Sequence, residues 1–370
     1  MNTLPPSLTD MLTGGDLDAE SSTHVLKLAT MYQRYFNEQV TDFTALKGDA
    51  SDRRIFRIAG EGHRAIGIIG PHLEENRAFI GFARSFRSAG LSVPEIYSVS
   101  RDEHLYLEED LGDVTLASWQ EALPASGWRE EMQTMYTRVL KELLRFQYDA
   151  AGKIDYSLCY QSTAFDAAAM LRDVDYFRDH VLERLLVIDW DTAGFVRDTR
   201  KLIDLLAGTA RNAFLYRDFQ SRNIMIREGS PCFIDFQSGR RGAPHYDVAA
   251  LLYDSRNRLD EADRMLLVSR YCEMLREKTP ATSRDYDHPG FLYLFHGFVV
   301  LRLMQALGAF ANLGLNKGKP AFLQLIPSRL QALRELLREA EIMRKLPVLR
   351  ELLLTLAVDP ASLSIPEGHS

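Results

Sequence analysis

The residues best suited to chemistry lie in two polar segments of the chain, Tyr216 to Asn223 (YRDFQSRN) and Cys232 to Gly239 (CFIDFQSG). In the first segment, Asp218 and Asn223 stand five positions apart between apolar runs, which is the profile of a catalytic loop. Phosphoryl transfer requires one carboxylate that accepts the proton of the attacking hydroxyl. It also requires oxygen ligands for Mg²⁺ and backbone N–H groups that bind the phosphates. The two segments therefore favour a phosphoryl-transfer site.

Each polar residue of these segments fits one role. Asp218 is predicted to be the base, while Asn223 and Asp235 offer a neutral and a charged oxygen to a hard cation that keeps several waters. The segment 231–236 is short, apolar and bounded by turns, so we expect a strand that delivers Asp235 at its end. Asp and Asn are also common turn formers. Two neighbouring features favour the kinase-like interpretation. They are the Ile-Asp-Phe strand and the apolar helix that begins next to Asp247.

Composition is that of an ordinary globular protein. The chain has 370 residues, 46% hydrophobic and 26% charged, which is enough for two domains or lobes. Its three cysteines, Cys159, Cys232 and Cys272, are far apart and show no metal-ligand spacing. The first twenty residues hold four acidic residues and no lysine or arginine, so neither a signal nor a transit peptide is expected. We therefore predict a reduced, cytoplasmic protein with a loose N-terminal tail.

Neither a membrane nor a nucleic acid is expected as a partner. The longest apolar run, 291–315, contains His296, Arg302, Gln305 and Asn312, which would be costly at the centre of a bilayer. A buried helix is the better interpretation. The formal net charge is −7, and no stretch concentrates lysine and arginine without interspersed acids.

The elements that must position the site divide into two groups, which predicts an α+β, bilobal fold. A leading helix at 22–39 and a helix at 72–89 that stops at Gly90 accompany a small antiparallel sheet. Its predicted strands are 43–46, 54–58, 65–69, 96–99 and 105–107. The composition changes near 108–113, so we predict an N-terminal nucleotide-binding lobe, 1–112, and a mainly helical C-terminal lobe with the catalytic loop and the substrate site, 113–370. Helices are expected in the second lobe at 128–148, 164–186, 191–206, 248–253, 260–277, 291–313 and 328–356.

The turn between the first two strands, 46–54, is a candidate phosphate cradle. It reads LKGDASDRR, with small residues that let backbone N–H groups approach an anion and arginines that can grip it. A polar hairpin tip would have the same composition. The residues predicted to bind the nucleotide phosphates are Gly48, Asp49, Ala50, Ser51, Arg53 and Arg54.

The lysine that protein kinases carry on the third strand is missing from 64–69. Arg53, Arg54 and Lys47 are the nearest cations that could neutralise the phosphates instead. Glu75, on the following helix, then lacks a lysine partner, and a solvated helix charge explains it as well as a functional role does.

Together these residues resemble the aminoglycoside phosphotransferase and choline kinase-like superfamily, which has a protein-kinase-like fold. Within it, the motifs GDAS, EDLGD, DFQSRN and IDFQ, which begin at Gly48, Glu109, Asp218 and Ile234, look like the bacterial amino-sugar kinases. Those enzymes act on the anomeric carbon of N-acetylmuramate or N-acetylglucosamine, or on related sugars, in cell-wall recycling.

This resemblance implies ATP and Mg²⁺ as cofactors, a small-molecule substrate, and the same roles for Asp218, Asn223 and Asp235. It also implies that Glu109 to Leu111 present backbone groups to adenine. Asp247 is implied to cap a helix and to brace the catalytic loop. A nucleotidyltransferase acting on the sugar phosphate product is an implied partner. Gln220 and Arg222 are candidates for facing the acceptor.

The chain departs from the superfamily pattern at three places. Tyr216 stands where histidine is usual, Gln237 replaces the glycine of the DFG-type motif, and the third-strand lysine is absent. Two alternatives therefore remain open: an aminoglycoside or choline-type phosphotransferase, and a nucleotide-binding pseudokinase acting as a regulator. The first would need an acidic pocket, for which Asp166, Asp173, Asp175 and Asp179 are candidates, although Arg172 and Arg178 between them favour a solvated face of mixed charge.

Overall fold

The computed structural model describes residues 5–13, 19–46, 52–124, 126–186, 188–278 and 288–358. The chain forms two compact units. Unit 1 comprises Met1–Leu116, Lys153–Gln161 and Asn223–Ser238, and unit 2 comprises Ala117–Gly152, Ser162–Arg222 and Gly239–Ser370. Two later segments of the chain thus fold with the N-terminal residues. Asn223 and Asp235 belong to unit 1, whereas Asp218 belongs to unit 2.

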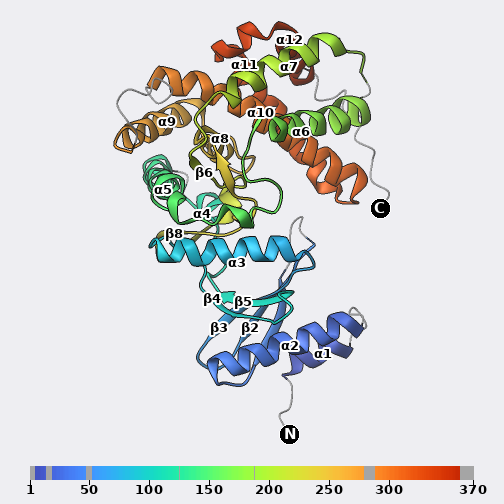
Figure 1. The fold of residues 1–370 in the computed structure, drawn as a ribbon, viewed down its shortest axis with the longest axis vertical. Helices are drawn as coiled ribbons and strands as arrows, with labels where there is room; N and C mark the ends of the chain where they lie inside the picture. The colour runs from blue at the N-terminus through green and yellow to red at the C-terminus, as the bar shows by residue number, and fades with distance from the viewer. Residues whose placement is uncertain are drawn as a thin grey trace. The chain divides into compact units, whose positions relative to one another are not determined.

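Unit 1 is built on a five-stranded antiparallel sheet in the order β1-β2-β3-β5-β4 (Figure 1). The strands are β1 (Asp42–Leu46), β2 (Arg54–Ala59), β3 (Arg64–Ile69), β4 (Ile96–Val99) and β5 (Leu105–Glu109). All five strands predicted from the sequence are present, each within two residues of its expected bounds.

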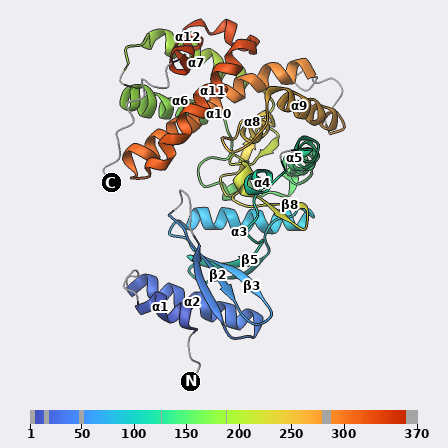
Figure 2. The same cartoon turned by 180° about the vertical axis from the view of Figure 1, so that it is seen from behind.

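Three helices cover the sheet, and Figures 1 and 2 show α1 and α2 on one face and α3 on the other. They are α1 (Pro6–Thr13), α2 (Ala19–Phe36) and α3 (Leu73–Ser88). Helix α3 ends before Gly90, whose φ of 74° lies in the left-handed region that glycine adopts at little cost. The predicted glycine stop is confirmed.

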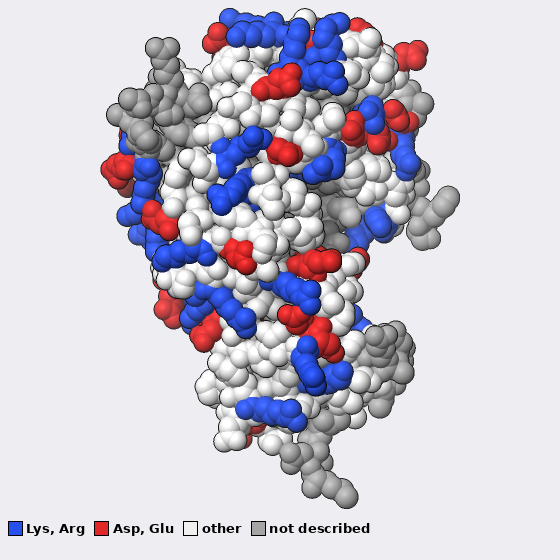
Figure 3. Space-filling model, viewed as in Figure 1, with Lys and Arg blue, Asp and Glu red and all other residues white. Residues whose placement is uncertain are grey.

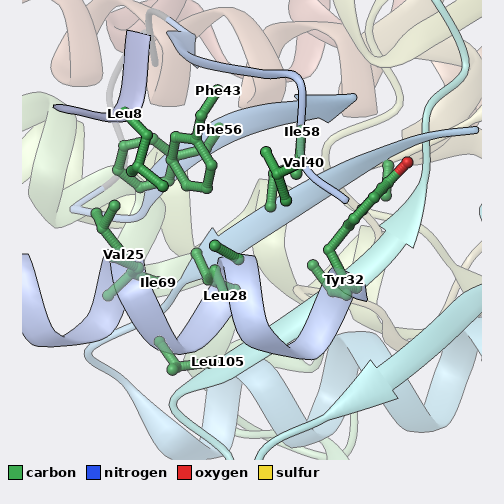
Figure 4. Close-up of a cluster of buried hydrophobic side chains, with 13 residues drawn as sticks. Leu8, Val25, Leu28, Tyr32, Val40, Phe43, Phe56, Ile58, Ile69 and Leu105 are labelled. Carbon is green, nitrogen blue, oxygen red and sulfur yellow. The ribbon is translucent and has the colours of Figure 1, made fainter. Parts of the chain in front are cut away.

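The expectation of a loose N-terminal tail is wrong for α1. Leu8 is fully buried in a cluster with Val25 and Leu28 of α2 and Phe43 and Phe56 of the sheet (Figure 4). The N–H of Phe43 also donates to the Ser7 hydroxyl at 3.0 Å. An eight-residue helix is marginal alone, so this packing stabilises it.

A hairpin also belongs to unit 1. Its strands are β7 (Ile224–Arg227) and β8 (Ser230–Phe233), joined by Glu228 and Gly229. Both turn residues have positive φ, 51° and 74°, as in the two-residue turns that suit the twist of antiparallel strands. The strand predicted at 231–236 is therefore present but ends at Phe233, and Asp235 follows it with φ 69°.

Unit 2 is mainly helical. Helix α10 is its long core helix and contacts α6, α8 and α11. The helices of this part of the chain are α4 (Leu116–Glu121), α5 (Trp128–Leu144), α6 (Ala167–Phe177), α7 (Thr192–Ala207), α8 (His245–Leu252), α9 (Glu261–Arg276), α10 (His288–Asn316), α11 (Ile326–Glu339) and α12 (Pro347–Val358). A two-stranded ladder, β6 (Ala213–Leu215) and β9 (Arg240–Gly242), precedes and follows the catalytic region.

Three helix predictions need correction. The helix expected at 128–148 becomes α5 followed by a π-helical stretch, Arg145–Asp149. The helix expected at 328–356 is divided into α11, a 3-10 turn (Glu341–Lys345) and α12. Helix α11 ends at Glu339, and Pro347 begins α12, a position where proline is favoured because its missing N–H is not needed there. The helix expected at 164–186 becomes α6 followed by a π-helical stretch, Arg178–Leu186.

Helix α10 is also the one described helix that is long and apolar enough to cross a membrane. Its sequence is apolar around most of its circumference, and many of its side chains are buried within unit 2, including Phe291, Phe298 and Leu307. The prediction of a buried helix is confirmed. On the face of the molecule shown in Figure 3, acidic and basic side chains are interspersed.

Candidate active site

The two predicted metal ligands lie together in unit 1. Asn223 Nδ2 donates to Asp235 Oδ2 at 3.0 Å, although the residues are twelve positions apart in the chain. Asn223 precedes β7 and Asp235 follows β8, so the pairing of the hairpin brings them together. The backbone N–H of Ile234 donates to the Asn223 carbonyl at 3.1 Å and fixes the same register. This pair presents amide and carboxylate oxygens, the hard ligands that Mg²⁺ prefers.

Arg53 is the cation that meets this pair. Its Nη2 donates to Asp235 Oδ1 at 2.8 Å, and its Nε lies 3.6 Å from Glu75 Oε1 on α3. The Arg53 side chain is only 13% exposed. Burial lowers its pKa, but Tyr106, Asp235 and Glu75 raise the pKa overall, which keeps the guanidinium charged.

Of the two interpretations left open for Glu75, the geometry disfavours a solvated helix charge, because its side chain is 17% exposed and lies against Arg53. In protein kinases a lysine of the third strand pairs with a glutamate of the following helix. Here the arginine before β2 pairs with Glu75. Arg54, the other cation predicted at this place, has its guanidinium 5.7 Å from the centre of the Phe56 ring. Arg53 is therefore the arginine that enters the carboxylate cluster.

Two further members of the cluster were not predicted from the sequence. Gln237, which is 5% exposed, donates from Nε2 to Asp235 Oδ1 at 2.9 Å and to Glu75 Oε1 at 3.3 Å. The residue that departs from the DFG-type pattern thus bridges the two carboxylates. Glu108 of β5 has a buried Oε2 with no hydrogen-bond partner among the described residues. Burial raises the pKa of Glu108 to about 8, against the lowering effect of Arg53.

Aromatic packing holds the segment around Asp235 in place within unit 1. The Phe236 ring stacks on Phe79 of α3, with centroids 4.7 Å apart and planes inclined by 4°. It also meets the edge of Phe86 at 5.2 Å. Because both phenylalanines are fully or almost fully buried on α3, the helix that supplies Glu75 also fixes the residue next to Asp235.

One of the residues predicted near adenine, Leu111, belongs to a small apolar cluster. Leu111, Met225 and Cys232 are buried together, with Ile234 packed against them. The side chain of Glu109 is 19% exposed and pairs with Arg227 and, at 3.3 Å, with Arg87. The described residues thus place Leu111 on an apolar surface and Glu109 in an ion-pair network.

The four residues predicted for the tip of the phosphate cradle, Gly48, Asp49, Ala50 and Ser51, lie outside the described residues. Their roles remain predictions. Asp52, which follows them, lies 3.5 Å from Nε2 of His72, and both side chains are largely exposed.

The catalytic loop lies in unit 2, where two buried aspartates hold its backbone. The N–H groups of Tyr216 and Arg217 donate to the two oxygens of Asp247 at 2.8 and 2.9 Å. Asp254 accepts from the N–H and the hydroxyl of Ser221 at 2.7 and 2.5 Å. These contacts lie on both sides of Asp218, so the loop is fixed at each end. Burial raises the pKa of Asp247 to about 7, although the two N–H bonds oppose the shift.

The predicted base and acceptor-facing residues occupy this loop. Asp218 and the side chains of Gln220 and Arg222 are partly buried, and the N–H of Gln220 donates to the Asp218 carbonyl at 2.9 Å. Tyr216, which replaces the usual histidine, is fully buried and makes edge contacts with Phe146 and Phe219. Its aromatic ring packs in the interior of unit 2, which explains why the departure is tolerated.

The acidic residues before the loop do not form a solvated face as a group. Asp173 is 8% exposed and pairs with Arg217 at 2.7 Å, so its interpretation as part of a solvated face is wrong. Asp175 and Asp179 do pair with Arg178, with side chains 38% and 47% exposed. Asp166 caps α6 by accepting from the N–H of Ala169 at 3.0 Å.

The fold and these residues define a class, a kinase-like phosphotransferase with an antiparallel-sheet unit and a helical unit. The model of the phosphotransferase enzyme family matches residues 42–286, about two thirds of the chain. The chain therefore belongs to the phosphotransferase enzyme family. Family membership and kinase-named relatives make it a small-molecule kinase, and the family implies the use of ATP.

Relatives and solved structures agree with this class. The N-acetylmuramate/N-acetylglucosamine kinase of Pseudomonas aeruginosa is 28% identical over 285 residues, covering 75% of this chain and 79% of that protein. The protein of the same name from Neisseria meningitidis is 25% identical over 319 residues, covering 85% and 91%. The structure of an ethanolamine kinase from Plasmodium vivax matches with a TM-score of 0.59 at 12% identity, covering 88% and 92%, and so shows the fold alone.

Proposed function

We propose that the protein is an ATP- and Mg²⁺-dependent kinase of a sugar or amino sugar, such as N-acetylmuramate or N-acetylglucosamine. The observation that carries the proposal is the junction of Asn223, Asp235 and Arg53 within hydrogen-bonding distance in unit 1. It combines two hard metal ligands with a permanent cation, the groups that phosphoryl transfer requires. The names of the curated relatives favour an amino sugar as acceptor.

In the proposed reaction, Asp218 accepts the proton of the acceptor hydroxyl while the hydroxyl oxygen forms a bond to the γ-phosphorus. The bond between that phosphorus and the bridging oxygen of ADP breaks, and its electron pair leaves with ADP. Asn223 and Asp235 would hold Mg²⁺, which supplies positive charge to the phosphate oxygens when bound. Arg53 binds the phosphates and Glu75 orients Arg53, as the lysine and glutamate do in protein kinases.

The remaining assignments follow the same proposal. Gly48, Asp49, Ala50, Ser51 and Arg54 contribute to the phosphate cradle, and the backbone of Glu109 and Leu111 binds adenine. Gln220 and Arg222 face the acceptor. The enzyme would act in the cytoplasm, in cell-wall recycling, and a nucleotidyltransferase would consume the sugar phosphate.

The described carboxylates disfavour a cationic acceptor such as choline or an aminoglycoside. Asp173 pairs with Arg217, and Asp175 and Asp179 share Arg178. Three of the four candidates for an acidic pocket are therefore engaged by arginines, and the fourth, Asp166, caps α6. A pseudokinase is disfavoured because Arg53 supplies the cation whose absence motivated that alternative.

The proposal can be tested with a coupled ADP-release assay in Mg-ATP over N-acetylmuramate, N-acetylglucosamine, simple hexoses, choline and kanamycin. We expect turnover with an amino sugar, and loss of that turnover in Asp218→Asn with nucleotide binding largely retained. Turnover with choline or kanamycin, and with none of the sugars, would show that the acceptor is a cationic compound rather than a sugar. Undiminished turnover in Asp218→Asn would overturn the assignment of the base.

A further inference from the structure

Arg217, which immediately precedes the proposed base, has a strained backbone. Its φ is 80°, in the left-handed region that a bulky L-residue rarely adopts. Such a conformation is energetically unfavourable for an L-residue and persists only where surrounding contacts hold it. The peptide groups on either side of this residue determine where Asp218 is placed. The contacts that maintain the strain are therefore part of the catalytic loop's architecture.

The side chain of Arg217 is held on three sides within unit 2. Its Nη1 and Nη2 donate to the two oxygens of Asp173 at 2.8 and 2.7 Å, a bidentate pair. Its guanidinium carbon lies 4.8 Å from the centre of the Phe165 ring and 4.9 Å from that of Tyr246, whose hydroxyl accepts a further hydrogen bond. Burial lowers the pKa of Arg217, but the charge of Asp173 more than offsets this, and the guanidinium stays charged.

The contacts of Asp173, Phe165 and Tyr246 with the Arg217 side chain form a clamp. This clamp is separate from the backbone contacts that Asp247 makes. Asp247 binds the backbone N–H groups of Tyr216 and Arg217, whereas Asp173 binds only the side chain of Arg217. Asp173 projects from α6 and stands 44 positions before Arg217 in the chain. The side-chain and main-chain contacts act on the same residue from different elements, and together they define its conformation.

We propose that Asp173 is a positioning residue for phosphoryl transfer, which holds Arg217 in its left-handed conformation and thereby places Asp218. The inference rests on the proposed role of Asp218. Without the clamp, Arg217 relaxes toward negative φ and the carboxylate of Asp218 moves from its working position. A displacement of about 1 Å at a reacting group can cost on the order of 100-fold in rate.

The first test compares two aspartates of the same helix in steady-state kinetics. Asp173→Ala is expected to lower kcat about 10- to 100-fold, with the KM for ATP changed about twofold or less, because this residue does not contact the nucleotide in the proposed site. The matched control is Asp175→Ala, which removes a half-exposed pair with Arg178 and should leave kcat unchanged. A kcat for Asp173→Ala equal to that of the wild type would overturn the proposal.

The second test separates placement of the loop from simple loss of stability. Glycine adopts a φ of 80° at little cost, so Arg217→Gly should not need the clamp. The double variant Asp173→Ala/Arg217→Gly is therefore expected to recover at least about tenfold of the kcat that Asp173→Ala loses. Failure of this rescue, in protein that melts within a few degrees of the wild type, would overturn the proposal.

Folding and function can be kept apart in these measurements. If Asp173→Ala does not fold, Asp173→Asn removes the charge while keeping the size of the side chain, and the same loss of kcat and the same rescue by glycine are expected. Asp218→Asn is measured beside them. Turnover retained in Asp218→Asn contradicts the proposed base, whereas an inactive Asp218→Asn beside a fully active Asp173→Ala contradicts the clamp alone.

Discussion

Replacing Glu108 by glutamine is predicted to remove a large pH dependence from the stability of unit 1. The Glu108 carboxyl is buried, and burial raises its pKa from the ordinary value of 4.5 to about 8. The folded state therefore binds a proton that the unfolded state releases between these two values. For a carboxyl whose pKa is raised by folding, stability is highest below pH 4.5 and falls as the pH rises toward 8.

The magnitude follows from the two pKa values. Each unit of pKa difference corresponds to about 1.4 kcal/mol. Between about pH 5 and pH 8, a shift from 4.5 to about 8 lowers the free energy of unfolding by about 3.5 kcal/mol. The glutamine side chain has no carboxyl to titrate, so the variant should lack this loss.

The assay is urea unfolding of the wild type and of Glu108→Gln at pH 5 and pH 8. Unfolding is monitored with a spectroscopic probe placed in unit 1. The quantity compared is the change in unfolding free energy between the two pH values. Glu109→Gln is the matched control on the same strand, because it removes a neighbouring charge and leaves Glu108 in place. If Glu108→Gln loses as much stability as the wild type between pH 5 and pH 8, the claim that Glu108 is buried in its protonated form is contradicted.

Three further predictions concern other residues. Arg53→Met is expected to raise the KM for ATP about 10- to 100-fold, because a charge-assisted contact is lost. The control Arg77→Met, on the exposed face of α3, should leave the KM unchanged. Equal KM values for Arg53→Met and the wild type in a kinetic assay would contradict the role of Arg53. Leu8→Ala should destabilise unit 1 by about 2–4 kcal/mol in urea unfolding, with the 39% exposed Leu26→Ala as control, and an effect below about 1 kcal/mol would show that α1 is not docked. Burial lowers the pKa of His296 to about 4, so its neutral form stabilises the fold above pH 6.5 and this stability is lost as the pH falls toward 4; His296→Leu should reduce that acid loss by about 3 kcal/mol in acid unfolding, and an unchanged loss would contradict it.

The elements of the sheet and the chemistry-bearing residues could be predicted from the sequence because their signals are local. Short apolar runs bounded by glycine or charged turns define the strands, and Gly90 marks the end of α3. Asn223 and Asp235 stand out as polar residues at the ends of short apolar strands, and the hairpin between them makes their contact predictable.

The partners of the charged residues could not be predicted, because they depend on contacts between distant segments. Arg53 meets Asp235 across 182 positions and Asp173 meets Arg217 across 44. Nothing in the neighbouring sequence distinguishes Asp173 from Asp175, yet one is buried and the other is half exposed. The start of α12 at Pro347 did have a local signal, since proline is favoured at the first position of a helix.

The most direct test of the central claim is identification of the product. The protein is incubated with Mg-ATP and N-acetylmuramate or N-acetylglucosamine, and the sugar is analysed by ³¹P NMR and mass spectrometry beside the Asp218→Asn variant. We predict one phosphate per sugar, formed in equal amount with ADP by the wild type and absent from the variant. ADP formed without a phosphorylated sugar, or equal product from Asp218→Asn, would contradict the account.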